Sequence, residues 1–178
     1  GTSLAGATAV VLVGDDPVAL ASSMADPAFR ATLTQAVRST PVVFADGSMT
    51  AVLGERWSAK ARPTSNTLEA EGVAAYRADD AAWQDGLALV PATVVPHLTD
   101  DFRWGRLYAG VAAAPADLAI GVASGSAVVL SPAGASVSGA SVVVADGSGA
   151  SSWVSANGAF GASGVVLDVF GSGDQLAR

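Results

Sequence analysis

The segment around the single histidine holds the residue types and spacing that best fit a chemical site. An apolar run at 87–95, typical of a β-strand, ends just before His97. Two of the nine cationic side chains, Arg103 and Arg106, follow within the next nine residues. Functional groups collect in loops after strands, because loops carry them without disturbing the sheet. The segment therefore predicts a site with His97 as its base.

Carboxylates follow two other expected strands. Asp15 and Asp16 come directly after the apolar run at 8–13, and Asp46 comes after a short run at 41–45. The first two are candidates to bind a metal or to position a water, although an aspartate before proline is also an ordinary helix-start signal. Asp46 is a candidate carboxylate nucleophile, but an Asp-Gly turn has a structural explanation as well.

Composition excludes several classes of function. The chain has no cysteine, which removes disulfides, thiolate metal sites and a cysteine nucleophile. With one histidine and no paired-histidine motif, we expect no metal site and no cofactor. The net charge of -7 disfavours nucleic acid and anionic lipid as partners, and no uncharged apolar stretch is long enough to predict a membrane span. Four scattered tryptophans indicate packing rather than a carbohydrate-stacking surface.

Apolar periodicity predicts alternating strands and helices first, and short strands afterwards. Strands are expected at 8–13, 41–45, 87–95, 118–122, 127–130, 141–145 and 165–170, and helices at 18–24, 27–37, 49–53, 66–77 and 104–114. Residues 54–66 are expected to form a loop. This order predicts one α/β domain over residues 1–178, with a small C-terminal antiparallel β extension.

The order of these segments resembles the serine peptidase family that includes cyanophycinase and the aspartyl dipeptidase called dipeptidase E. The matching segments are Gly14-Asp15-Asp16, Asp46-Gly47-Ser48 at the family's nucleophile elbow, His97 to Leu107, Gly121 to Ala127, and the tail ending at Asp174. The resemblance implies a flavodoxin-like three-layer α/β sandwich with a mostly parallel sheet. It also implies that Arg103 and Arg106 bind a substrate carboxylate, near Asp15 and Asp46, although ion pairs with Asp100, Asp101 or Asp117 would explain the two arginines equally.

The departures from the family pattern affect its catalytic groups. Aligned without gaps, the elbow serine falls on Gly47 and the family's acidic glutamate falls on Ser124. Only the base remains, and a lone His97 cannot activate a hydroxyl that is not there. The resemblance therefore implies a catalytically degraded homologue that serves as a binding or structural subunit.

Two alternatives stay open. In the first, Ser48 is a shifted nucleophile that works with His97 in an exopeptidase for aspartyl or β-linked peptides. In the second, the high content of alanine, valine, glycine and serine and the scarcity of lysine suit an assembly protein of a surface layer or filament.

The family has a further β-α-β portion before the segment that matches residue 5, and this portion supplies central strands of the sheet. Without it, strand edges and apolar faces would meet water. We therefore expect a second polypeptide, or an N-terminal fragment of the same precursor, to complete the sheet, and we expect an oligomer. An extracytoplasmic or cell-surface location is favoured, although the sequence does not fix the compartment.

Overall fold

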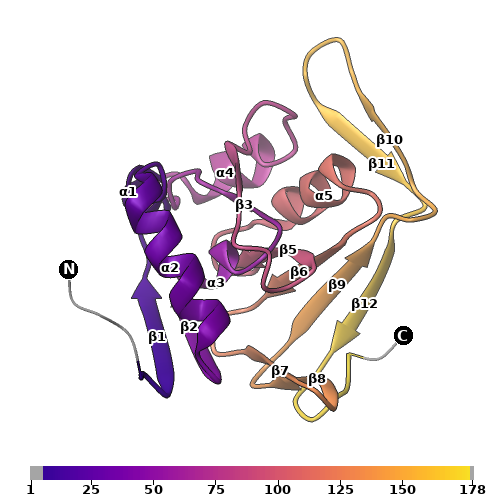
Figure 1. Ribbon diagram of the computed structural model, residues 1–178. Helices are drawn as coiled ribbons and strands as arrows, with labels where there is room; N and C mark the ends of the chain where they lie inside the picture. Colours follow the sequence, from indigo (N-terminus) through magenta and orange to yellow (C-terminus); the bar gives the residue numbers. More distant parts are fainter. Residues whose placement is uncertain (1–5, 177–178) are drawn as a thin grey trace.

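The computed structural model describes residues 6–176, in which five helices and twelve strands form (Figure 1). The helices are α1 (Pro17–Met24), α2 (Pro27–Ser39), α3 (Met49–Val52), α4 (Leu68–Ala74) and α5 (Trp104–Ala113). The strands are β1 (Ala9–Gly14), β2 (Val42–Gly47), β3 (Arg56–Ser58), β4 (Trp83–Asp85), β5 (Ala92–Pro96), β6 (Leu118–Val122), β7 (Ala127–Ser131), β8 (Gly134–Ser138), β9 (Val142–Asp146), β10 (Ser151–Val154), β11 (Phe160–Ser163) and β12 (Val166–Phe170). None of the described helices has the length and apolar character needed to cross a membrane.

β1 and β2 form a parallel two-stranded ribbon at one end of the structure (Figure 1). Its side chains alternate between two faces, as the period of a strand requires. On the inner face, Val10 and Leu12 join a core that includes Leu20 of α1 and Val37 of α2. On the outer face, Val11 and the other side chains that point away from the core are exposed. The ribbon is therefore covered on one side only.

The two helices that cover the ribbon both begin at an aspartate followed by proline. The Asp16 carboxylate accepts hydrogen bonds from the backbone N–H groups of Val18 and Ala19, at 2.9 and 3.0 Å. Asp26 caps α2 in the same way, at 2.9 Å from Ala28 N. Proline fits the first helical position because no intrahelical hydrogen bond needs its missing N–H. The helix-start interpretation of Asp16 is thus confirmed.

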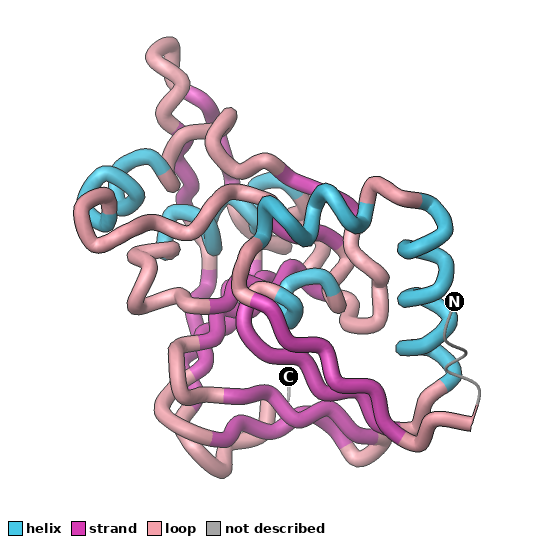
Figure 2. Tube along the Cα trace, turned by 90° about the vertical axis from the view of Figure 1, so that its left-hand side faces the viewer, coloured by secondary structure: helices cyan, strands magenta, loops and turns pink. Residues whose placement is uncertain are grey.

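The larger sheet has the strand order β12-β9-β6-β5, and only the β5–β6 pair in it is parallel. All five residues of β5 are buried. On one face, Leu107 and Val111 of α5 pack against Val143 of β9. On the other face, Val142 and Val144 pack with Val137 of the β7–β8 hairpin. The β1–β2 ribbon is a separate two-stranded sheet, and Figure 2 views the molecule from the side on which the ribbon lies.

The expected flavodoxin-like sandwich with a mostly parallel sheet is wrong. Among the described strands, β1–β2 and β5–β6 are the only parallel pairs, and they belong to different sheets. Short connections join β7 to β8 and β10 to β11, and a short connection between neighbouring strands gives an antiparallel hairpin. Residues expected to form a loop at 54–66 include β3, which pairs with β4. The protein is an α/β protein built from small mixed and antiparallel sheets.

The β10–β11 hairpin projects from the body of the molecule (Figure 1). Its strands pair across Trp153 and Gly161, and a Cβ at Gly161 would lie 2.5 Å from the indole ring. The ring therefore covers the glycine backbone. The hairpin is also hydrogen-bonded to the end of α4, where Tyr76 O accepts from Phe160 N at 2.8 Å and Arg77 Nη1 donates to Asn157 O at 3.2 Å.

Candidate functional site

The ends of β1, β2 and β5 meet in a cluster of polar side chains. His97 follows β5, and its Nε2 lies 2.8 Å from Oδ1 of Asp15, which follows β1. The same carboxylate oxygen accepts a hydrogen bond from the backbone N–H of Ser48, which follows β2, at 3.2 Å. The structure thus brings together three of the residues that the sequence singled out. Contrary to the expectation of a lone base, His97 has a carboxylate partner.

Arg62 joins this cluster from the segment between β3 and α4. Its guanidinium group is ion-paired with the second Asp15 oxygen and binds both oxygens of Asp101, at 2.9 and 3.1 Å. Planar guanidinium and carboxylate groups match in such two-bond contacts. Arg62 therefore links the end of β1 to the loop that begins α5. Sequence analysis missed the contact between Arg62 and Asp101, because it spans 39 positions and follows no motif.

His97 has an unusual backbone and a shifted pKa. Its φ of 55° lies in the left-handed region, which few non-glycine residues adopt. Burial, followed by the nearby charge of Arg62, lowers the pKa of the imidazole below its usual value. The neutral ring is therefore favoured, and in the tautomer that carries its proton on Nε2 the ring donates to Asp15. This hydrogen bond orients the ring.

Ser48 does not reach the imidazole. It is 2% exposed, and its hydroxyl has no hydrogen-bond partner among residues 6–176. A serine nucleophile needs a base within hydrogen-bonding distance of its Oγ. The contact of Ser48 with the cluster is made instead by its backbone N–H.

The carboxylate of Asp15 blocks the position where the resembled family has its nucleophile. Gly47 has a φ of +62°, and a Cβ placed on it would lie 2.7 Å from Asp15 Oδ1 and 2.8 Å from Gly14 O. Both distances are too short for a side chain at this position. The glycine is therefore required by the way Asp15 packs, and residue 47 could not carry a serine without a shift of the cluster.

Arg103 and Arg106 lie inside the protein and face acidic side chains. Arg106 is 1% exposed, and its Nη2 donates to Glu71 at 2.8 Å and to Asp80 at 2.9 Å. Lys60 forms a second ion pair with Asp80. Burial raises the pKa of Asp80, but the hydrogen bonds from Lys60 and Arg106 outweigh it, so the net shift is downward.

Arg103 has a weaker set of partners. It is 3% exposed, and its Nε lies 3.4 Å from Asp101, whose oxygens already bind Arg62. Burial lowers the pKa of Arg103, although a guanidinium group remains charged at any ordinary pH. Arg103 and Arg106 thus both lie at the start of α5, and both side chains are buried.

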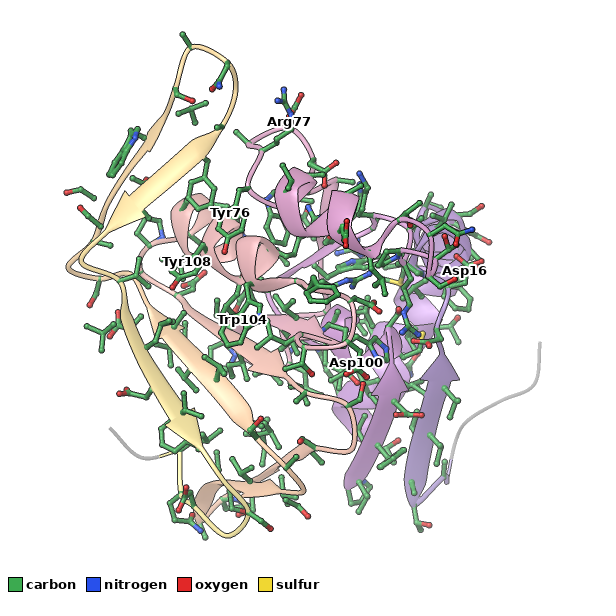
Figure 3. The ribbon with its side chains drawn as sticks, turned by 180° about the vertical axis from the view of Figure 1, so that it is seen from behind. Asp16, Tyr76, Arg77, Asp100, Trp104 and Tyr108 are labelled. Carbon is green, nitrogen blue, oxygen red and sulfur yellow. The ribbon has the colours of Figure 1, made fainter. Side chains whose placement is uncertain are left out.

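The other candidates lie apart from this cluster. Asp46 is an exposed residue of β2 whose register partner is Val13, and Asp16 caps α1. Figure 3 shows Asp100 between α5 and the β1–β2 ribbon, with Tyr76, Trp104 and Tyr108 nearer the β10–β11 hairpin. In the part of the chain that the structure describes, no three acidic or histidine side chains are grouped so as to hold a metal ion.

Comparison of the chain with protein-family models found no match, and neither did a search of the curated proteins. The resemblance to the cyanophycinase and dipeptidase E family therefore stays a prediction. What the chain does must be argued from the arrangement of its own residues.

Proposed function

We propose that this chain is a non-catalytic binding or structural subunit, whose open β1–β2 face is covered by another polypeptide. The observation that carries the first half is the Asp15 carboxylate, which lies against Gly47 and holds His97 at 2.8 Å. The imidazole of His97 is hydrogen-bonded to the Asp15 carboxylate, and no hydroxyl among the described residues is hydrogen-bonded to the ring. A degenerate relative of the resembled peptidases would have this character.

Asp15 itself is a poor candidate nucleophile. One of its oxygens accepts from Ser48 N and His97, and the other is ion-paired with Arg62. A carboxylate that accepts this many charge-assisted and backbone hydrogen bonds is stabilised as a ground-state anion. The cluster therefore serves to fix the ends of β1, β2 and β5 relative to one another.

The outer face of the β1–β2 ribbon supports the second half of the proposal. Val11, Val13, Val42 and Phe44 share this face through the parallel register, and each is more than half exposed. Parallel strands are ordinarily covered on both faces, because their connections place other elements there. Neither ribbon edge pairs with another described strand. A partner that presents an apolar surface with an exposed strand would therefore fit this face.

A second copy of this chain is the occupant that the experiment tests, because its own ribbon presents such a surface. Sedimentation of the wild-type protein should show a concentration-dependent dimer, and Val13→Lys should abolish it while the fold is retained. Val18→Lys, which changes an exposed valine of α1, is the matched control and should leave the dimer intact. A wild type that stays monomeric, or equal effects of the two variants, would show that a second copy of this chain is not the polypeptide that covers this face.

The non-catalytic half is tested separately. The purified wild type should not hydrolyse a panel of aspartyl and β-linked dipeptides. Hydrolysis by the wild type that is lost in both Ser48→Ala and His97→Ala would instead establish the exopeptidase.

A further inference from the structure

A small cavity lies between the carboxyl end of β2, the strands β3 and β5, and helices α3 and α5. Ser48, Arg103 and Arg106 line it, together with Ser58 and apolar atoms of β5. It has room for about one water-sized particle. The cavity is distinct from the contact between Asp15 and His97, because neither of those residues lines it.

The side chains around this cavity carry hydrogen-bond donors with no acceptor. Ser48 Oγ, Nε and Nη2 of Arg103, and Nε and Nη1 of Arg106 are all buried and have no hydrogen-bond partner among residues 6–176. The three residues are at most 3% exposed. Buried donors are nearly always bonded, and leaving those of a charged group unbonded is especially costly. The arrangement therefore favours an occupant that accepts hydrogen bonds.

The existing ion pairs do not meet this need. Both carboxylates that bind Arg106 contact the same nitrogen, Nη2. Asp101 is committed to Arg62, and its separation of 3.4 Å from Arg103 Nε gives an ion pair without a hydrogen bond. The remaining buried N–H groups of the two guanidinium groups are thus left without an acceptor.

We propose that the cavity binds a single monatomic anion, with chloride as the physiological species. An anion accepts from several N–H and O–H donors at once, as these three residues require. A cation would be repelled by the two arginines. Sulfate and phosphate are also anions, but a central atom with four oxygens needs much more room than a single halide ion, so the small cavity favours a monatomic anion. The anion would tie the end of β2 to α5, independently of what covers the β1–β2 face.

Thermal unfolding in different sodium salts at constant ionic strength tests this site. Chloride and bromide should raise the midpoint in a saturable way, whereas sulfate should not. Ser48→Ala removes one unbonded donor and should weaken the apparent chloride affinity by about tenfold. Ser23→Ala is the matched control, because Ser23 lies on α1, does not line the cavity, and donates its hydroxyl to Ala19 O at 3.1 Å. This control should keep the wild-type chloride response.

A crystal grown with bromide gives a direct readout. An anomalous peak between Ser48 and the two arginines, lost in Ser48→Ala or in Arg103→Met, would support the site. The proposal is overturned by a water in that position, by equal midpoints in all the salts, or by equal losses of chloride response in the two serine variants. None of these outcomes depends on the association of two chains.

Discussion

Asp15 Oδ1 lies 2.8 Å from His97 Nε2, although the strands that precede the two residues belong to different sheets. The contact spans 82 positions in the sequence. It is one of the contacts that fix the β1–β2 ribbon to the rest of the structure, and Arg62 reinforces it from a third segment. Under the proposed function, this cluster holds segments of the fold together and performs no chemistry.

The lowered pKa of His97 predicts a loss of stability on mild acidification. The unfolded imidazole takes up a proton as the pH falls below about 6.5, whereas the folded ring resists protonation until a lower pH. The free energy of unfolding should therefore decrease between about pH 6.5 and the lower folded pKa. Urea unfolding at pH 7.5 and 5.5 measures this change.

His97→Asn is the control for that experiment, because asparagine also tolerates the left-handed backbone at this position. The variant should lose the part of the pH dependence that belongs to the imidazole, while the carboxylates titrate as before. An imidazole NMR titration with a midpoint above 6.5 in the folded protein would be incompatible with this account.

The packing of Asp15 against residue 47 predicts the effect of restoring a serine there. Gly47→Ser should destabilise the protein by about 2 kcal/mol or more. The substitution places a side chain on a left-handed backbone and brings it into close contact with Asp15. Gly125→Ala isolates the backbone part, because Gly125 has a φ of +73° with nothing within 4 Å of its Cβ position. It should cost about 1 kcal/mol.

The contact part is measured by a double-mutant cycle. If Asp15 is the obstacle, Gly47→Ser should be better tolerated in an Asp15→Ala background, with a coupling of about 1 kcal/mol in the free energy of unfolding. Strict additivity would show that Gly14 O, rather than Asp15, limits the position.

Two neighbouring residues of β1 predict opposite outcomes for the two faces of the ribbon. Leu12 is buried in the core beside α1 and α2, so Leu12→Ala should lower the free energy of unfolding by about 3 kcal/mol. Val11 is 64% exposed, and Val11→Ala in the dissociated chain should change it by less than about 0.5 kcal/mol. Chemical denaturation at low protein concentration measures both, and a large loss for Val11→Ala would mean that this face is covered within a single chain.

The sequence was a good guide to single elements and a poor guide to their pairing. Periodicity placed strands near β1, β2, β6 and β9, and the aspartate before Pro17 marked the start of α1. Periodicity does not state which strands lie side by side. An antiparallel C-terminal extension was expected, and β9 does pair antiparallel with β12, but the pairing of β9 with β6 in the larger sheet was not foreseen. Short strands such as β3 and β10, with little apolar content, gave no signal.

The same limit applies to the cluster. His97, Asp15 and Ser48 stood out because each follows an apolar run, and the carboxyl ends of such runs do come together. Arg62 lies in a polar segment rich in turn-forming residues, where any side chain would have been equally plausible. Its role follows from tertiary contacts with Asp15 and Asp101 alone.

The β10–β11 hairpin makes its backbone hydrogen bonds to Tyr76 and Ala78, at the end of α4. Residues separated by about 80 positions therefore protect one another's amides, as the Arg77–Asn157 contact also indicates. Hydrogen exchange should report the two segments as one cooperative opening unit, with matching rates at Ala78 and Phe160. Disruption of the β10–β11 hairpin would consequently also destabilise the end of α4, which lies about 80 residues earlier in the chain.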